Sequence, residues 1–267
     1  YKLCLNAGIK PIIGCEVYVV ENHQKKEGKE NPNHLVLLAE NQEGYKNLLK
    51  LVTISHLEGF YYRPRLDKKL LSTYSEGLIA LSGCLKGEVA CRILEDNLTQ
   101  AQKTALEYAA IFGKDNFYLE LQDHSLAEQK KINFWLKNLS KKLSIPLVAT
   151  NDVHYLKPED ARIHDILLSV QTLSVMGKAL SLPSREHYFK REEEMYKLFY
   201  DTPDALENTA LIASRCNVKL DLGSLNLPEI HVPPGYDTQK YLEKLCLEGA
   251  KKHYKNPLPL EVSERLS

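Results

Sequence analysis

The sequence predicts an α/β protein built on a parallel sheet or barrel. Short apolar runs typical of buried strands alternate, over residues 9–150, with longer segments whose apolar residues recur at helical spacing. This order of strand, helix, strand and helix is typical of a parallel sheet covered by helices, either open or closed into a barrel. A chain of 267 residues is long enough for most of one such barrel.

Five segments are predicted to be strands because they are short, apolar and bounded by turn residues. They are residues 14–20, 35–39, 78–81, 117–122 and 147–150. In the fourth of these, apolar residues alternate with polar ones such as Glu120 and Gln122, which predicts a strand with one exposed face. Five strands are too few to close an ordinary barrel, so further strands are expected outside the chain.

Helices are predicted between and after these strands from apolar residues at helical spacing and from capping residues. They are residues 44–56, 98–112 with Asn97 as N-cap, 132–143, 192–199, 203–213 with Thr202 as N-cap, and 238–254. Residues 2–7 resemble the last turn of a helix, and residues 261–267 resemble the start of another. We therefore expect a fragment cut at both ends, with the missing strands before Tyr1.

Composition narrows the classes of function. Lys plus Arg and Asp plus Glu each number 35, so the chain as a whole lacks the basic footprint of a nucleic-acid-binding domain, and any such contact must be a local patch. The six cysteines form no Cys-x-x-Cys pair. No signal peptide or long apolar span is visible, so a reduced, cytoplasmic setting without a membrane is expected.

Asp152 and His154 follow directly after the fifth predicted strand. Two residues apart on extended backbone, their side chains point to the same side. A carboxylate oxygen and an imidazole nitrogen aimed at one point suit a divalent transition metal. In the alternative interpretation, Asp152 caps a turn and His154 packs at the surface.

Three further residues with the chemistry of metal ligands lie at other predicted strands. Glu16 lies inside the first strand, where an unpaired carboxylate is costly, so its partner is a metal or a nearby Lys or Arg. His34 precedes the second strand, whereas the sites of parallel barrels lie at the carboxyl ends of strands. Its alternative role is to cap or pack against the strand. Cys84 follows the third strand. It is either a soft metal ligand that favours zinc or a small buried hydrophobic residue.

Asp123 and His124 follow the fourth predicted strand, where a turn role is expected and support of the metal ligands is the alternative. The remaining histidines, His187 among them, show no arrangement that indicates a site. The candidate ligands form a mixed hard and soft set that could hold zinc or manganese and activate water for attack on a phosphate ester. The glycine patterns of nucleotide-binding loops and the nucleophile elbow of hydrolases are absent.

Six segments, residues 8–18, 34–39, 59–65, 76–84, 148–155 and 192–195, carry a resemblance to a known family. Their sequences are GIKPIIGCEVY, HLVLLA, GFYYRPR, EGLIALSGC, VATNDVHY and EEEM. In this order and spacing they resemble the polymerase-and-histidinol-phosphatase (PHP) domain in the N-terminal region of bacterial DNA polymerase III alpha subunits. The resemblance covers nearly the whole chain.

The resemblance implies an incomplete distorted (β/α)7 barrel whose first two strands are missing, followed by a helical segment leading toward the polymerase palm. It also implies five metal ligands: Glu16, His34, Cys84, Asp152 and His154. The Cys84 position is histidine in stand-alone phosphatases and cysteine in many polymerase members. The opening His-x-His of the family and the Asp and His that follow would lie before Tyr1.

The resemblance further implies a partial PHP domain at residues 1–180 and its helical C-terminal part at 181–223. Residues 224–267 would be a Pro-rich connector and a helix at the start of the palm. No catalytic residue for polymerisation would then lie in this chain. We expect that this chain alone neither extends a primer nor holds a full metal cluster.

As a function, the resemblance implies DNA-directed DNA synthesis by the full protein and a metal-dependent 3′–5′ exonuclease or phosphoesterase site in the PHP domain. The expected cofactors are zinc or manganese in this site and magnesium in the polymerase site. The expected partners are DNA, deoxynucleoside triphosphates, a proofreading exonuclease subunit, the sliding clamp and other replisome subunits. Two alternatives stay open: a non-catalytic, metal-stabilised scaffold that docks the proofreading exonuclease, and a stand-alone phosphoesterase similar to histidinol phosphatase.

Overall fold

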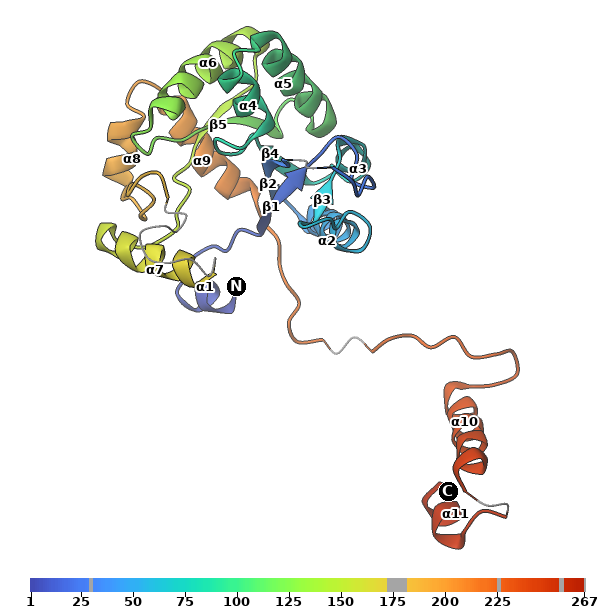
Figure 1. Cartoon of the computed structure of the whole chain (residues 1–267). Coiled ribbons are helices and arrows are strands. Elements are labelled where there is room, and N and C mark those ends of the chain that lie inside the picture. Colours follow the sequence, from blue (N-terminus) through green and yellow to red (C-terminus); the bar gives the residue numbers. More distant parts are fainter. Residues whose placement is uncertain (29–30, 172–181, 225–226, 255–256, 267) are drawn as a thin grey trace. The chain divides into compact units, whose positions relative to one another are not determined.

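A mixed sheet is the centre of the fold. The computed structural model describes residues 1–28, 31–171, 182–224, 227–254 and 257–266, and within these ranges six strands join one sheet (Figure 1). The strands are β1 (Gly14–Val19), β2 (Asn33–Ala39), β3 (Arg65–Leu66), β4 (Leu78–Leu81), β5 (Phe117–Leu121) and β6 (Leu147–Ala149). Their order across the sheet is β3-β1-β2-β4-β5-β6. The two-residue strand β3 was not among the predicted strands, because so short a segment carries no periodicity.

The prediction of a parallel sheet is wrong for β2. This strand pairs antiparallel with both neighbours, β1 and β4, whereas β1 and β3, β4 and β5, and β5 and β6 pair parallel. The cause is the connection between β1 and β2, whose described residues form no helix. Two consecutive strands joined without a crossover helix pair antiparallel. The amino end of β2 therefore lies at the edge of the sheet where β4, β5 and β6 have their carboxyl ends.

The structure confirms most of the predicted helices, whose ends differ from the predicted ends by a few residues. They are α1 (Lys2–Asn6), α2 (Gln42–Leu57), α3 (Lys68–Thr73), α4 (Glu88–Leu94), α5 (Leu98–Phe112), α6 (Ala127–Leu143), the 3-10 turn η1 (Pro158–Asp160), α7 (Ala161–Gln171), α8 (Glu192–Leu198), α9 (Pro203–Arg215), α10 (Thr238–His253) and α11 (Leu260–Leu266). The Asn97 side chain caps α5 by accepting from the backbone N–H of Gln100. Thr202 precedes α9, but its side chain makes no capping bond.

Both faces of the sheet are covered. The helices α2 and α4 contact β2, and α5 and α6 contact β5. On β2 the buried side chains Leu35, Leu37 and Ala39 alternate with the partly buried Val36 and Leu38. The second set packs against a buried cluster to which α9 contributes, and which consists of Ile79, Leu81, Tyr118, Val148, Ile212 and Cys216.

The prediction of a half-exposed strand at residues 117–122 is wrong. Every residue of β5 is buried, and even Glu120 is only 5% exposed. The reason is that α5 and α6 contact this strand, while Tyr118 belongs to the cluster to which α9 contributes. Alternation of polar and apolar residues therefore marks Glu120 as a buried polar group that needs partners, rather than as part of a solvent face.

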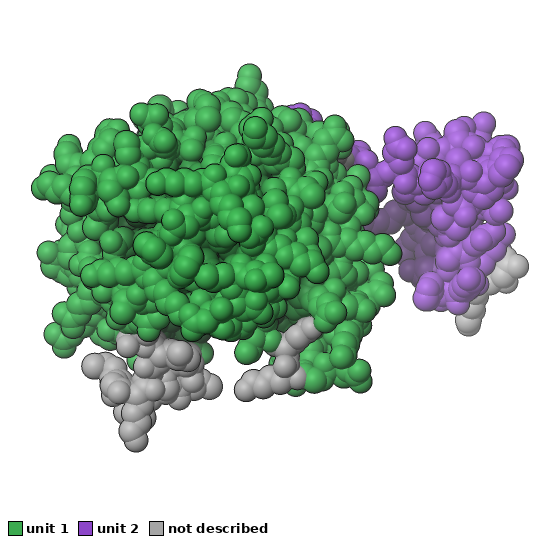
Figure 2. Space-filling view, turned by 90° about the horizontal axis from the view of Figure 1, so that it is seen from above, with its two compact units in different colours: residues 1–219 green, residues 220–267 purple. Residues whose placement is uncertain are grey.

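The described chain divides into two units, residues 1–219 and 220–267 (Figure 2). The first unit holds the whole sheet, and the second holds α10 and α11, which contact one another. The predicted boundary at residue 180 falls within residues 172–181 and so lies outside the described residues. Among the described helices, none combines the length and the apolar character needed to cross a bilayer.

Candidate metal centre

The reversed direction of β2 brings His34 beside the loop that follows β4. The backbone N–H of His34 donates to the carbonyl of Lys86 at 2.9 Å, so the start of β2 is bonded directly to this loop. Gly83, one residue before Cys84, approaches so closely that a Cβ atom on it would lie 2.7 Å from the carbonyl oxygen of His34. His34 lies at the amino end of its strand, which the rule for parallel barrels disfavours. Because β2 is reversed, this end lies at the edge of the sheet where the site forms.

Glu16, His34 and Cys84 form a first trio of possible ligands. His34 Nδ1 lies 2.9 Å from Glu16 Oε1 and 3.7 Å from Cys84 Sγ. One ligand atom from each residue lies within 4.8 Å of the others. Donor atoms around a tetrahedral zinc lie roughly 3.3–3.6 Å apart, given its bond lengths to nitrogen, oxygen and sulfur. These spacings are therefore close to those of a shared ion.

Asp152, His154 and His187 form a second trio, also within 4.8 Å of one another. Asp152 Oδ1 lies 3.8 Å from His154 Nδ1, and Asp152 Oδ2 lies 3.9 Å from His187 Nδ1. Asp152 has a φ of 47°, in the left-handed region that non-glycine residues rarely adopt, which is typical of turns and functional sites. The backbone N–H of His154 donates to the carbonyl of His187 at 2.8 Å and so fixes the two segments together.

His187 is held by stacking and by burial. Its ring lies on that of His124, with centroids 3.9 Å apart and an interplanar angle of 16°. His124 is itself fixed, because Gln129 Nε2 donates to its Nδ1 and its Nε2 donates to the carbonyl of Asn151. Burial lowers the pKa of His187 to about 4, so the ring is neutral, as a metal ligand must be. Its Nε2 is buried without a hydrogen-bond partner among the described residues.

The two trios act on each other electrostatically. Burial, together with the carboxylates of Asp152 and Glu16, raises the pKa of the Cys84 thiol to about 11. The hydrogen bond from His34 lowers the pKa of Glu16, and the nearby His154 lowers it as well. Asp152 and His154 of the second trio thus lie close enough to influence ligands of the first. Because carboxylates, imidazoles and a thiol meet at one edge of the sheet, the residues present fit one or more divalent cations of the zinc or manganese type.

Glu120 joins the loops that carry the two trios. Its Oε2 accepts from the backbone N–H of Gly83 at 3.0 Å, next to Cys84. Its Oε1 accepts from the Thr150 hydroxyl at 2.5 Å and from Gln122 Nε2 at 2.9 Å. Burial raises the pKa of Glu120. This carboxyl group therefore links the segment that precedes Cys84 to the segment that precedes Asp152.

The structure brings together all five ligands that the sequence indicated, in two neighbouring groups, and their binding of a metal stays a prediction. The sequence interpretation missed His187 and Glu120. Of the pair Asp123 and His124, Asp123 accepts from the backbone N–H of Ser125 and forms a turn, as expected. His124 is fully buried and supports His187, which corresponds to the alternative role.

The close approach of Gly83 leads to a first prediction. Gly83→Ala should lower the free energy of unfolding by roughly 2–3 kcal/mol, because the residue has a φ of 83° and its new Cβ would meet the His34 carbonyl. The variant should also bind zinc more weakly, because Cys84 must shift. Urea denaturation and zinc titration measure the two effects. The matched control is Gly8→Ala, which has a similar φ of 69° but no atom within 4 Å of a Cβ, and an equal loss in both variants would contradict the crowding argument.

Comparison with known proteins gives the family. Residues 1–124 match the family model of the PHP domain. Over 99% of its length the chain is 45% identical to DNA polymerase III subunit alpha of Borreliella burgdorferi, and the match covers 24% of that protein. It is 39% identical to the same subunit of Chlamydia muridarum, over 100% of the chain and 26% of that protein. For Thermus aquaticus the identity is 39%, over 95% of the chain and 22% of that protein.

The chain thus spans about a quarter of the length of the curated relatives it matches. These relatives share one name, and the similarity extends through both units of the chain, beyond the part that the family model matches. The α/β architecture with its six-stranded mixed sheet is consistent with a PHP-type fold. Residues 1–124 of the chain thus match the PHP-domain family, and the chain over its whole length is similar to bacterial DNA polymerase III alpha subunits.

Proposed function

We propose that this chain carries a metal-dependent phosphoesterase site that acts as a 3′–5′ exonuclease on DNA. The observation that supports this proposal is the convergence of the two trios at one edge of the sheet, with Asp152 acting electrostatically on Cys84. The metal ligands would be Glu16, His34, Cys84, Asp152 and His154, together with His187. A divalent cation held there would supply the Lewis acidity that activates water and neutralises charge on a phosphate ester.

The full protein would be a DNA-directed DNA polymerase, by analogy with the named relatives. Its substrates would be DNA and deoxynucleoside triphosphates, with magnesium at a polymerase site outside this chain. Its partners would be a proofreading exonuclease, a sliding clamp and other replisome subunits. Within the chain, residues 1–180 and 181–223 would form the two parts of the PHP region, as a (β/α)7 barrel completed by strands before Tyr1. Residues 224–267 would lead toward the palm.

A second candidate function is a metal-stabilised scaffold that docks a proofreading exonuclease. The observation that favours it is the apolar face of α7, on which Ile163, Leu167 and Val170 are exposed although they are large and hydrophobic. In this case the metal would hold the fold without serving catalysis. The stand-alone phosphoesterase has no such support, because the relatives named above are all polymerase subunits.

Removal of the Cys84 ligand tests the metal centre directly. Cys84→Ser should weaken zinc binding to this chain by about tenfold or more, because a soft thiolate donor is replaced by a hydroxyl. Competition with a chromophoric chelator measures the affinity. Cys246→Ser, which changes an exposed cysteine on α10, should leave the affinity unchanged. Zinc binding that is equal in both variants would contradict the proposed centre.

Chelation separates the two candidate functions. In the full-length protein, removal of the metal by a chelator should lower both the melting temperature and the rate of nuclease digestion, and added zinc or manganese should restore both. A lower melting temperature with no nuclease rate to lose would favour the scaffold. The measurements are differential scanning fluorimetry and release of labelled nucleotides from single-stranded DNA.

A further inference from the structure

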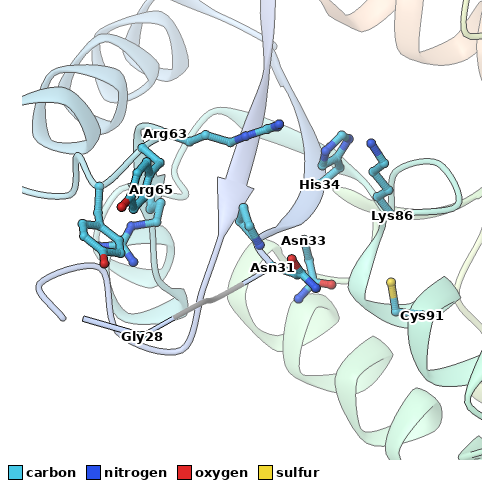
Figure 3. A pocket seen from close by; sticks show the side chains of 11 residues that line it. Gly28, Asn31, Asn33, His34, Arg63, Arg65, Lys86 and Cys91 are labelled. Atoms are coloured by element: carbon cyan, nitrogen blue, oxygen red, sulfur yellow. The ribbon is translucent and has the colours of Figure 1, made fainter. Parts of the chain in front are cut away.

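A cavity of about 880 Å³ lies beside the first trio. Its lining includes His34, so the cavity reaches the candidate metal centre itself (Figure 3). The described residues that line it include three cationic side chains, Arg63, Arg65 and Lys86, and two tyrosines, Tyr61 and Tyr62, but no carboxylate. This local basic surface contrasts with the zero net charge of the whole chain.

The three cations have different roles. Arg65 is buried, and its guanidinium donates to the carbonyls of Gly59, His23 and Lys25, so it holds the surrounding loops in place. Arg63 and Lys86 are exposed. Because Arg65 already serves the protein backbone, Arg63 and Lys86 are the cations that a ligand would meet.

Arg63 and Lys86 lie on either side of the His34 ring in the first trio (Figure 3). The Arg63 guanidinium lies 4.9 Å from the centre of the Tyr18 ring, and the Tyr18 ring meets that of His34 at 5.2 Å. Figure 3 shows the Arg63 side chain extending across β1 toward His34, with Lys86 on the other side of that ring. The backbone carbonyl of Lys86 accepts from the N–H of His34 at 2.9 Å, so Lys86 lies directly beside this ligand. Two positive charges thus flank His34, one of the ligands at which a phosphate ester would react.

Two tyrosines form an aromatic platform at the same cavity. The rings of Tyr61 and Tyr62 meet edge to face, with centroids 4.6 Å apart, and the Arg65 guanidinium lies 5.1 Å from the centre of the Tyr61 ring. Tyr62 is 84% exposed and has a φ of 60°. An exposed aromatic side chain held by left-handed backbone contributes little to the core, and a planar group that stacks on it would use its face.

We infer that this cavity binds the end of a single-stranded polynucleotide, with Arg63 and Lys86 contacting its phosphates and Tyr62 stacking on a base. Cations that follow a phosphate backbone, combined with exposed aromatic rings, are the combination by which proteins bind single strands without reading their sequence. The cavity is far larger than one phosphate group requires and reaches His34, so a strand lying in it would present a phosphodiester to the first trio. The choice of a phosphodiester as substrate rests on the proposed exonuclease function.

Fluorescence anisotropy tests this inference on the chain itself. It measures the binding of a labelled oligothymidylate of about eight nucleotides in the presence of EDTA. Arg63→Gln and Lys86→Gln should each weaken binding about fivefold, and the double variant should reduce the slope of log K against log salt by roughly 1.4, at about 0.7 per phosphate contact on a single strand. Tyr62→Ala should weaken binding about tenfold, and Tyr62→Phe should retain it. Lys103→Gln, on α5 outside the cavity, is the matched control for loss of one charge.

Equal binding by the wild type and by the Arg63, Lys86 and Tyr62 variants, or no binding by the wild type, would overturn the inference. So would competition by inorganic phosphate or thymidine monophosphate at the concentration at which the oligonucleotide competes, because the cavity would then be a site for small phosphate compounds. Because EDTA removes the metal, strand binding is measured independently of hydrolysis. Binding that is retained in a protein without nuclease activity would contradict the proposed function and leave this inference intact.

Discussion

Asp152→Asn, introduced into the full-length protein that contains this chain, should reduce the 3′–5′ nuclease rate about a hundredfold or more. The substitution keeps the size of the side chain and removes its negative charge. That charge acts on both groups of ligands, because Asp152 lies within the second trio and influences Cys84 of the first. Release of nucleotides from 3′-labelled single-stranded DNA in the presence of manganese is the measurement.

The matched control for this variant is Asp115→Asn, at an exposed carboxylate outside both trios. It should digest DNA at the rate of the wild type. A nuclease rate for Asp152→Asn within about twofold of the wild type, with an unchanged melting temperature, would show that the Asp152 charge serves no catalysis and would favour the scaffold.

Glu120→Leu should destabilise the first unit by roughly 3 kcal/mol, which corresponds to a melting temperature about 6–12 °C lower. The substitution removes the acceptor for the Gly83 N–H, the Thr150 hydroxyl and the Gln122 amide. It leaves the Gly83 N–H buried without this acceptor, whereas the Gln122 amide keeps its bond to the Thr150 hydroxyl oxygen. Glu120→Gln should cost much less, because its amide oxygen can still accept from Gly83. Thermal denaturation followed by circular dichroism gives the comparison.

Glu207→Leu provides the control for this second prediction, since Glu207 is exposed on α9. Its melting temperature should stay within about 1–2 °C of the wild type. If Glu120→Leu melted at the wild-type temperature, the buried carboxyl group would contribute nothing net to stability. The hydrogen bonds that connect the Gly83 and Thr150 loops would then be offset by the cost of burying Glu120.

The sequence predicted the elements better than their directions. Apolar runs located β1, β2, β4 and β6, because buried strands need apolar side chains, and alternation of apolar and polar residues located β5. The reversal of β2 was not visible, because periodicity shows that a strand is buried and says nothing about the sense in which it pairs. His34 was therefore identified by resemblance while its position at the start of a strand argued against it, and the reversal removes that conflict.

The two residues that the sequence interpretation missed were missed for physical reasons. His187 lies in an irregular segment far from Asp152 in the chain, and its role depends on stacking on His124, which no local pattern encodes. Glu120 fits the alternation of a half-exposed strand, and only the packing on both faces of β5 shows that it is buried. A charged residue within an otherwise apolar strand was the available signal. It was used for Glu16 and could have been used for Glu120.

The antiparallel pairing of β1 with β2 also bears on the order in which the protein folds. Tyr18 is paired with His34 across a single connection between consecutive strands, so Glu16 and His34 can meet after one local loop closure. Cys84 joins His34 across 50 residues, and Asp152 and His187 must close a separate loop of 35. Contacts between residues close in sequence form fastest. A hairpin that already presents a carboxylate and an imidazole could therefore capture a metal ion early during synthesis, before the rest of the sheet has formed.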